Sequence, residues 1–340
     1  MSTVPALSRS LDTIARELLV LDAEVAVHRI SEALRSQVGR TLRRKGVVVA
    51  MSGGVDSSVC AALAVRAFGP ERVFGLMMPE RDSDPRSRSL AEELAAKLGI
   101  AYVLEDIAPI LDAAGCYRRR DDAVRTVVPE YDAAWGMKVV LSVDRFESDR
   151  LNISQLTVRP PAGEERTVRL PPAAYLAIVA ATNFKQRVRK MLEYYHADRL
   201  HYAVVGTPNR LEYDQGFFVK GGDGLADVKP IAHLYKTQVY QLAEYLGVPD
   251  SITSRAPTTD TYSIPQTQEE FYFSLPVPAM DVLLHARAHG RTAETVAGEL
   301  SISAAQVERV FRDIDQKRAT TRYLHTPALL VEPVHVQPEA

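Results

Sequence analysis

The chain has 340 residues, of which 46% are hydrophobic and 25% charged, and its formal net charge is −2. This length is enough for one large α/β domain or two smaller ones with a full apolar core. The near-neutral balance argues against a general nucleic-acid binder, which is usually basic. No run approaches the roughly 18 apolar residues of a membrane span, and two cysteines, Cys60 and Cys116, indicate a reducing compartment. We therefore expect a cytoplasmic protein that binds neither membranes nor nucleic acid.

Residues 1–45 form an N-terminal segment with an amphipathic pattern. Apolar side chains recur at roughly helical spacing within residues 11–44, which predicts one or two helices with an apolar face. The residues that define this face are Leu18, Leu21, Val25, Ile30 and Leu34.

A short apolar run at residues 46–51 is followed by a loop rich in serine and glycine, and then by a predicted helix at residues 59–67. The run is β-branched and free of charge, as in a strand buried in a parallel sheet. A loop of this kind leaves backbone N–H groups unpaired at the positive end of the helix, which favours a bound anion. The loop residues are Ser52, Gly53, Gly54, Val55, Asp56, Ser57 and Ser58.

Asp56 is unusual in an anion-binding loop. A carboxylate beside a bound phosphate repels it unless a metal cation lies between the two groups. The loop therefore predicts a nucleotide bound together with Mg²⁺. It is not a Walker A motif, because that motif needs a lysine after its last glycine, where this chain has Val55 and Asp56.

Further predicted strands at residues 72–78, 101–104 and 202–205 alternate with helices such as the one at residues 89–98. This alternation predicts an α/β fold, a doubly wound parallel sheet with helices on both faces. Ligands collect at the carboxyl ends of the strands in such folds. The Ser52 loop and the pair Gly206 and Thr207 both fall at that edge.

The rhythm changes in the middle of the chain, where we predict a β-rich insertion at about residues 111–172. Short strands are expected at residues 138–143, 151–158 and 167–170, with a turn at residues 160–163. A basic cluster precedes these strands and is either an exposed turn or a contact for an anionic substrate. Its residues are Arg118, Arg119 and Arg120.

The Ser52 loop resembles the pyrophosphate-binding loop of the N-type ATP pyrophosphatases. Downstream, the chain resembles the NAD synthetase family, of the ammonia-dependent type without a glutaminase domain. The similarity runs from about residue 22 to residue 327, apart from the insertion, so we treat residues 46–327 as the catalytic domain and residues 328–340 as a tail. It is carried by residues 183–189, 206–212, 216–227, 234–238 and 257–260, and by residues 315–318, where Gln316 stands in place of the family's usual histidine.

This resemblance implies roles for individual residues. Asp56 and Lys236 would be catalytic, and Asp56 and Glu212 would ligate Mg²⁺. ATP would be the co-substrate, bound by Ser52, Gly53, Gly54, Val55, Asp56, Ser57, Ser58, Thr207, Lys236 and Thr258. The acceptor, deamido-NAD in this family, would be held by Arg187, Lys220, Asp227, Gln316 and Lys317.

The resemblance also implies a reaction. The acceptor carboxylate attacks the α-phosphate of ATP, pyrophosphate leaves, and ammonia converts the acyl-adenylate to an amide with release of AMP. Neither Cys60 nor Cys116 has the context of a glutaminase nucleophile, so the chain is expected to use free ammonia or a separate glutaminase partner. A homodimer with the N-terminal helices packed across its two-fold axis is implied as well.

Two alternatives remain open from the sequence. Gln316 and the insertion ahead of Arg187 raise the possibility of a related amide ligase that acts on a different carboxylate. Residues 292–307 resemble a helix-turn-helix, which would make the chain a nucleotide-sensing regulator that binds DNA. Glu308 lies next to this segment with Arg309 and Arg312 as nearby cations, which is a weak charge pattern for DNA binding.

Overall fold

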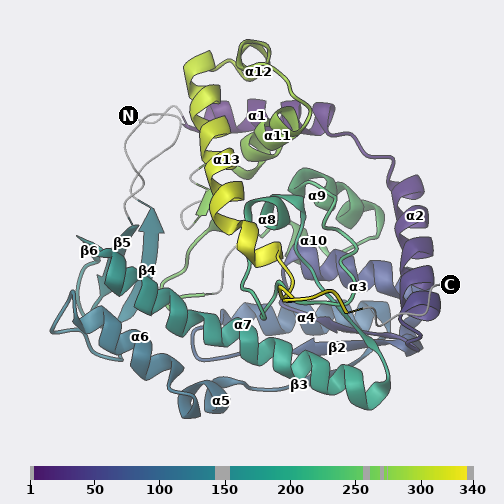
Figure 1. The fold of residues 1–340 in the computed structure, drawn as a ribbon, viewed down its shortest axis with the longest axis horizontal. Coiled ribbons are helices and arrows are strands. Elements are labelled where there is room, and N and C mark those ends of the chain that lie inside the picture. Colours follow the sequence, from purple (N-terminus) through teal and green to yellow (C-terminus); the bar gives the residue numbers. More distant parts are fainter. Residues whose placement is uncertain (1–3, 142–153, 256–260, 269–271, 274, 335–340) are drawn as a thin grey trace.

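A parallel four-stranded sheet forms the centre of the computed structural model (Figure 1). Its order is β3 (Ala101–Leu104), β2 (Val73–Met77), β1 (Val47–Ala50) and β7 (Ala203–Val205), and all four predicted strands are confirmed. The chain order reverses between β1 and β7, so the carboxyl ends of these two strands form the crevice where ligands bind in doubly wound folds. The structure describes residues 4–141, 154–255, 261–268, 272, 273 and 275–334.

Helices cover both faces of the sheet, as predicted. Val47 and Val49 of β1 pack into one apolar core, and Val48 packs into another on the opposite face. Alternate side chains of a strand point to opposite faces, and in a parallel sheet both faces are covered, which is why the run is apolar throughout. The first face carries α2 (Ala23–Arg35), α3 (Val55–Phe68), α4 (Pro85–Leu98) and α9 (Lys236–Tyr245), and the second carries α5 (Ala108–Ala113), α6 (Cys116–Arg125) and α7 (Pro172–Leu200).

A separate helical core lies beside the sheet, at the top of Figure 1. It contains α1 (Val4–Leu18), α11 (Val277–Ala288), α12 (Ala293–Leu300) and α13 (Ala304–His325). The helix-turn-helix segment corresponds to α12 and the start of α13. Val296, Val307 and Val310 of these two helices are fully buried in this core. The segment that resembles a helix-turn-helix is therefore packed into this helical core.

The predicted β-rich insertion contains an antiparallel sheet of β4 (Gly136–Leu141), β5 (Ser154–Arg159) and β6 (Arg166–Arg169). These strands match the predicted ones within the described residues. The expectation that helical structure fades from Leu111 is wrong, because α5 and α6 extend as far as Arg125.

Charge conceals the helical pattern of α6. Arg120 is only 2% exposed and forms ion pairs with Asp82 and Asp121, so a charged side chain occupies a core-facing position of the helix. A sequence pattern based on apolar side chains cannot register such a position. The idea that Arg120 belongs to an exposed basic turn is therefore wrong.

The N-terminal segment consists of α1, α2 and a π-helical turn, Ser36–Thr41. Ile30 and Leu34 are buried against the sheet domain, whereas Leu18 and Val25 are 38% and 61% exposed, so part of the predicted apolar face remains open. The remaining short helices are the 3₁₀ turn Pro70–Arg72, α8 (Arg210–Gln215) and α10 (Asp250–Thr253).

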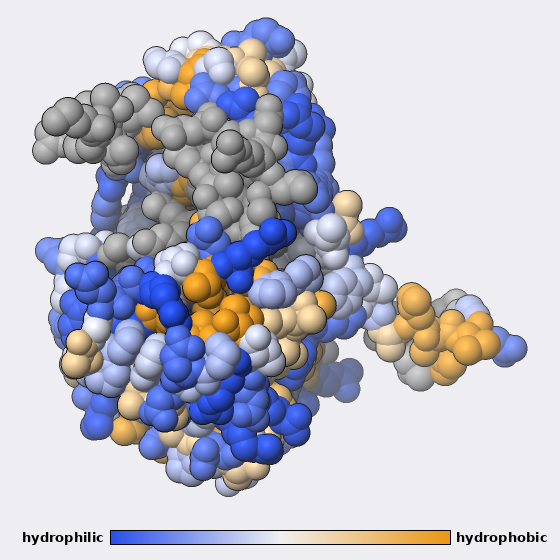
Figure 2. All heavy atoms as spheres, turned by 90° about the vertical axis from the view of Figure 1, so that its left-hand side faces the viewer, coloured by the Kyte–Doolittle hydropathy of each residue, from blue (hydrophilic) through white to orange (hydrophobic). Residues whose placement is uncertain are grey.

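Beyond α13 the chain forms an extension that projects from the body of the molecule, at the right of Figure 2. It is apolar and solvent-exposed, with Leu329, Leu330, Val331 and Val334 all more than half exposed. Across the described residues, the longest and most apolar helices fall short of what a membrane crossing requires.

Candidate active site

The Ser52 loop connects β1 to α3 at the crevice between β1 and β7. Ser57 Oγ donates to the carbonyl oxygen of Gly54 at 3.0 Å and lies 3.1 Å from Ser52 Oγ, which fixes the shape of the loop. Gly53 has a φ of +73°, and a Cβ there would lie 2.5 Å from the carbonyl oxygen of Ser87, so the position requires glycine. Among the described residues no side chain caps the N-terminus of α3, which leaves its first N–H groups for a bound anion.

Lys236, at the start of α9, extends its ammonium to the carboxylate of Asp56, near the start of α3. Lys236 is 1% exposed, and Glu212 of α8 lies in the same group. Burial by itself lowers the pKa of Lys236, but the carboxylates of Asp56 and Glu212 outweigh it and hold the pKa above the ordinary lysine value. The lysine therefore keeps its positive charge at the end of the anion-binding loop.

Glu212 and Asp56 are held by neutral amides as well as by the lysine. Asn209 Nδ2 donates to Asp56 Oδ1 at 3.0 Å, and Gln268 Nε2 donates to Glu212 Oε1 at 2.9 Å. Burial, together with the negative charge of Asp56, raises the pKa of Glu212 to about 8. Two carboxylates thus share one lysine, an arrangement that leaves room for a further cation.

Asn209 is a site residue that was not predicted. It is fully buried, caps α8, and forms a capping box with Glu212, whose backbone N–H donates to Asn209 Oδ1 at 3.2 Å. The sequence signal that could have found it is an asparagine three residues before a glutamate, two positions after Thr207.

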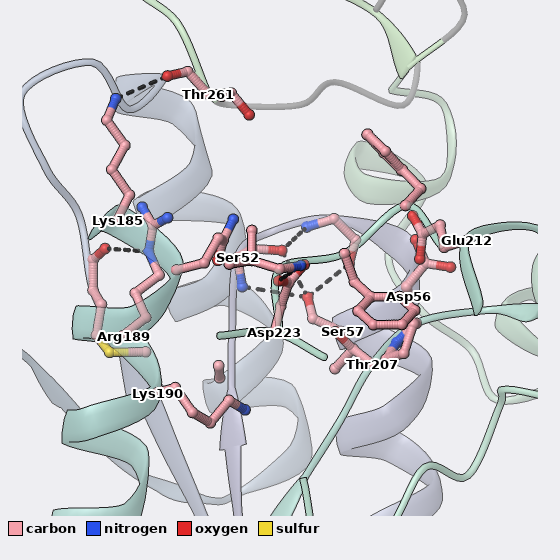
Figure 3. A pocket seen from close by; sticks show the side chains of 18 of the residues that line it. Ser52, Asp56, Ser57, Lys185, Arg189, Lys190, Thr207, Glu212, Asp223 and Thr261 are labelled. Atoms are coloured by element: carbon pink, nitrogen blue, oxygen red, sulfur yellow. Dashed lines mark hydrogen bonds between the residues drawn. The ribbon is translucent and has the colours of Figure 1, made fainter. Parts of the chain in front are cut away.

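A cavity of about 820 Å³ opens beside this group, a size in the usual range for small-molecule sites (Figure 3). Most of the predicted ATP residues and part of the predicted acceptor set line this same cavity. On its wall are Ser52, Gly54, Val55, Asp56, Ser57, Thr207, Glu212 and Lys236, together with Arg187 and Lys220. The structure therefore brings these ten predicted residues together around one cavity.

The other predicted site residues lie elsewhere. Asp227 accepts hydrogen bonds from the backbone N–H of Val204 at 2.8 Å and from the hydroxyl of Tyr194 at 3.2 Å. Lys317 Nζ donates to the carbonyl oxygen of Tyr272, which does line the cavity, at 2.9 Å. None of these predicted residues is part of the cavity wall itself: Gly53, Ser58, Asp227, Gln316 and Lys317. Thr258 lies outside the described residues.

Lys220 joins the loop after α8 to the C-terminal helix. Its ammonium donates to the carbonyl oxygens of Tyr323 and Thr326, each at 2.8 Å, and its own carbonyl oxygen accepts from Arg187 Nε at 3.3 Å. Tyr323 also lines the cavity. The end of α13 therefore forms one border of the cavity, next to Arg187 and Lys220.

A buried ion network that was not predicted borders the cavity next to the insertion. Lys185 Nζ donates to Glu80 Oε1, Asp82 Oδ2 and the carbonyl oxygen of Thr261, each at 2.8 Å. Burial alone raises the pKa of Asp82, but Lys185 and Arg120 outweigh it and hold the pKa below its usual value. Glu80 follows β2 at the carboxyl edge of the sheet, and that position is the signal that could have marked it.

A second buried ion pair, between Lys190 and Glu193 of α7, also borders the cavity. Lys190 Nζ donates to Glu193 Oε2 at 2.6 Å, and Asp223 accepts from the backbone N–H of Val219 at 2.8 Å. Burial raises the pKa of both Glu193 and Asp223. All three charged residues line the cavity, and Figure 3 shows Lys190 and Asp223 on its wall.

Comparison with known proteins agrees with the sequence resemblance. The family model for NAD synthase matches residues 26–128 and 165–323, so β4 and β5 of the insertion lie between the two matched segments. A Mesorhizobium japonicum protein named NH(3)-dependent NAD(+) synthetase is 59% identical over 313 residues, covering 92% of this chain and 98% of the relative. A Rhizobium meliloti protein of the same name is 56% identical over 318 residues, covering 94% and 95%.

Solved structures share the fold at lower identity. NMN synthetase from Francisella tularensis superimposes with a TM-score of 0.62 at 22% identity, covering 91% of this chain and 98% of that one. NH3-dependent NAD synthetase from Campylobacter jejuni gives a TM-score of 0.60 at 20% identity, covering 92% and 100%. With the family model matched over most of the catalytic domain and relatives more than half identical along nearly their whole length, this chain belongs to the NAD synthase family.

Proposed function

We propose that this protein is an ammonia-dependent NAD synthetase, which forms the amide of NAD from deamido-NAD and ammonia while ATP is cleaved to AMP and pyrophosphate. The observation that carries the proposal is that the Ser52 loop, the Lys236–Asp56 pair and the cations Arg187 and Lys220 line one cavity. The relatives that share this activity by name are similar along nearly their whole length. The alternative of a different carboxylate acceptor finds no support in them.

The first step forms an acyl-adenylate. A carboxylate oxygen of deamido-NAD attacks the α-phosphorus of ATP, and the bond from that phosphorus to the oxygen that bridges to the β-phosphorus breaks. The N–H groups at the start of α3 bind phosphate oxygens, and the charge of Lys236 stabilises the departing pyrophosphate. Activation is needed because a free carboxylate is a poor electrophile.

The second step forms the amide. Ammonia attacks the acyl carbon, the carbon–oxygen bond to AMP breaks, and a proton leaves the nitrogen. The acceptor must stay bound between the two steps, and Arg187 and Lys220 supply positive charge for its phosphates on the far side of the cavity. Neither step requires a covalent bond to the protein.

The residues present fit a magnesium ion. Asp56 and Glu212 are hard oxygen donors beside the phosphate loop. Burial, together with the negative charge of Asp56, raises the pKa of Glu212, and a bound cation would oppose this shift. Within the described residues no cluster of three or more candidate ligands is found. Mg²⁺ is typically bound by one or two carboxylates plus substrate phosphates, so these two side chains are a sufficient protein contribution. When bound, Mg²⁺ would neutralise charge on the triphosphate.

We propose free ammonia as the nitrogen source. Burial, together with the nearby carboxylates of Asp56 and Glu212, raises the pKa of the Cys60 thiol. Burial also raises the pKa of Cys116, whose Sγ donates to the carbonyl oxygen of Ala181. Both thiols are therefore poor nucleophiles, unlike the cysteine that a glutaminase needs. In the cell, a separate glutaminase could supply this ammonia. We expect the protein to act in the cytoplasm.

We also propose a homodimer formed through the N-terminal helices. Leu18 at the end of α1, Val20 in the link to α2 and Val25 in α2 are 38%, 71% and 61% exposed, which gives a second copy an apolar surface to cover. Light scattering on the purified protein should give twice the chain mass of 37.6 kDa, and Val25→Glu should shift the mass toward the monomer. A monomeric wild-type protein would refute the dimer.

The central experiment measures pyrophosphate release with ATP, Mg²⁺ and ammonium, with and without deamido-NAD. Release should depend on deamido-NAD, NAD should appear in equal amount, and Asp56→Ala should abolish both. Glutamine in place of ammonium should give no product. Pyrophosphate release without any NAD would reject deamido-NAD as the acceptor.

A further inference from the structure

A carboxylate from the helical core reaches the first turn of the helix that carries Lys236. Asp281, on α11, has no solvent exposure. Its Oδ2 accepts a hydrogen bond from the backbone N–H of Thr237 at 2.7 Å and another from Thr237 Oγ1 at 2.9 Å. Asp281 is 44 positions away from Thr237 in the sequence, so this contact depends on the packing of α11 against α9.

The start of α9 needs such a partner. The first N–H groups of a helix have no partner inside the helix, and a negative charge there is favourable for the helix dipole. Gln238, in the first turn of α9, accepts a hydrogen bond from the backbone N–H of Tyr235 at 3.1 Å, which leaves the N–H of Thr237 to a partner outside the helix. Asp281 supplies the missing acceptor and the negative charge from another helix.

The residue beside this contact is the site lysine. Lys236 is the first residue of α9 and Thr237 is the second, so the bonds from Asp281 hold the backbone within one residue of the lysine Cα. The ammonium of Lys236 then reaches Asp56 across the crevice. A small rotation of the first turn of α9 would displace the ammonium from Asp56, because the position of a buried side chain follows that of its backbone.

The buried carboxylate of Asp281 lowers the stability of the fold unless its hydrogen bonds compensate. Its Oδ1 is buried and has no hydrogen-bond partner among the described residues. A buried carboxylate with one unsatisfied oxygen costs stability, so the charge at this position is explained by the two hydrogen bonds that it accepts from Thr237. The neighbouring Val282 is equally buried and apolar, so the helix–helix contact does not itself demand a charge.

We propose that Asp281 is a positioning residue for Lys236: it fixes the first turn of α9 and thereby aims the lysine ammonium at the phosphates of ATP. The proposal rests on the function proposed above, in which Lys236 stabilises the departing pyrophosphate. Asp281 itself touches neither ATP nor the acceptor. It acts through the hydrogen bonds to Thr237, and the C-terminal helical core is thus part of the catalytic apparatus.

The test compares Asp281→Ala with Asp281→Asn and with the control Val282→Ala, which removes apolar volume from the same helix without touching Thr237. Asp281→Ala should lower kcat for pyrophosphate release at least tenfold while the KM for deamido-NAD changes less than twofold. Asp281→Asn keeps an oxygen acceptor and should recover most of kcat. Val282→Ala should lower the melting temperature and leave kcat within twofold of wild type.

The pairing with Lys236 is tested by a double-mutant cycle on ATP binding, which needs no acceptor. Calorimetric titration of MgATP should show that Asp281→Ala and Lys236→Ala each weaken binding about fivefold or more, and that the double variant is no weaker than Lys236→Ala alone. Additive losses would overturn the proposal, as would an unchanged kcat in Asp281→Ala. If Asp281→Ala fails to fold, Thr237→Val, which removes one of the two donors, takes its place in the cycle.

This cycle separates the two proposals. If wild-type protein binds MgATP but makes no NAD, the proposed acceptor is wrong, and the coupling between Asp281 and Lys236 is still decided by the binding data. If NAD is made and the cycle is additive, the proposed function stands and the positioning role of Asp281 falls.

Discussion

The ammonium of Lys236 contacts the carboxylate of Asp56 although the two residues are 180 positions apart in the chain. Each lies in the first turn of its helix, α9 or α3, and both helices cover the same face of the sheet. The contact therefore brings a buried positive charge to the mouth of the anion-binding loop. It also joins the lysine that we propose for the leaving group to the carboxylate that we propose as a metal ligand.

Replacing Lys236 with alanine should lower kcat for pyrophosphate release by about 10²–10³, because a preorganised charge at the site of a leaving group contributes on that scale. A steady-state assay with saturating ATP and deamido-NAD measures the loss. Lys97→Ala removes an exposed lysine from α4 and should leave kcat unchanged. Equal rates in the two variants would remove Lys236 from the mechanism.

Glu212→Gln should raise the Mg²⁺ concentration needed for half-maximal activity by about tenfold, since the amide keeps the shape but loses the charge of one of two metal ligands. A titration of activity against Mg²⁺ at fixed ATP measures this shift. Gln268→Ala removes a hydrogen bond to Glu212 and keeps the carboxylate, so it should change the Mg²⁺ requirement much less. A Mg²⁺ requirement that Glu212→Gln leaves untouched would exclude Glu212 as a ligand.

The stability of the folded chain should depend on pH through Asp281. Burial raises the pKa of Asp281 from 3.8 to about 6, although hydrogen bonds from Thr237 and the charge of Lys236 oppose the shift. The folded state thus binds this proton more tightly than the unfolded state. Protonated Asp281 therefore adds to the free energy of unfolding below about pH 4, and this contribution is lost as the pH rises to about 6. The loss is roughly 3 kcal/mol.

Asp281→Asn removes this titration, so the variant should gain free energy of unfolding relative to wild type between pH 4 and pH 6. Urea unfolding of both proteins at pH 4.5 and pH 8 measures the difference. At pH 8 the variant should be at least as stable as wild type even if its activity is lower. If the free energy of unfolding of the variant falls relative to wild type as the pH rises, the assigned direction of the pKa shift is wrong.

Lys185→Met should destabilise the fold by about 3–5 kcal/mol, because it leaves the buried carboxylates of Glu80 and Asp82 without their shared cation. Chemical denaturation measures the change. Arg86→Ala breaks a solvent-exposed ion pair with Asp84 and should have a much smaller effect. If both variants unfold at the same denaturant concentration, the network around Lys185 contributes no more than a surface pair.

The parts of the fold that could be predicted are those that local patterns determine. The apolar run before Ser52 and the loop after it identify a strand, an anion site and a helix, because neighbouring residues alone decide them. The site residues Asp56, Glu212 and Lys236 followed from resemblance, and the structure brings them together. Their grouping at the end of β1 and β7 follows from the parallel order of the sheet.

What could not be predicted depends on partners distant in the sequence. Arg120 looks like a surface residue until Asp82 is seen beside it, and α6 is missed for the same reason. Asp281 is unremarkable in a helix until α11 is seen against α9. For Asp227, the resemblance and the structure point to different partners. The resemblance assigns it to the acceptor, whereas in this structure its carboxylate accepts a hydrogen bond from the backbone N–H of Val204.

The contacts of Lys220 link the cavity to the end of α13. A lysine ammonium has three N–H donors, and two of them are taken by the carbonyl oxygens of Tyr323 and Thr326 at the end of α13. The third donor is enough to meet a phosphate oxygen of the acceptor without breaking either bond. A bound substrate would then hold Lys220 in place, and Lys220 would hold the carbonyl groups of Tyr323 and Thr326. Binding of the substrate and ordering of the end of α13 would therefore favour each other.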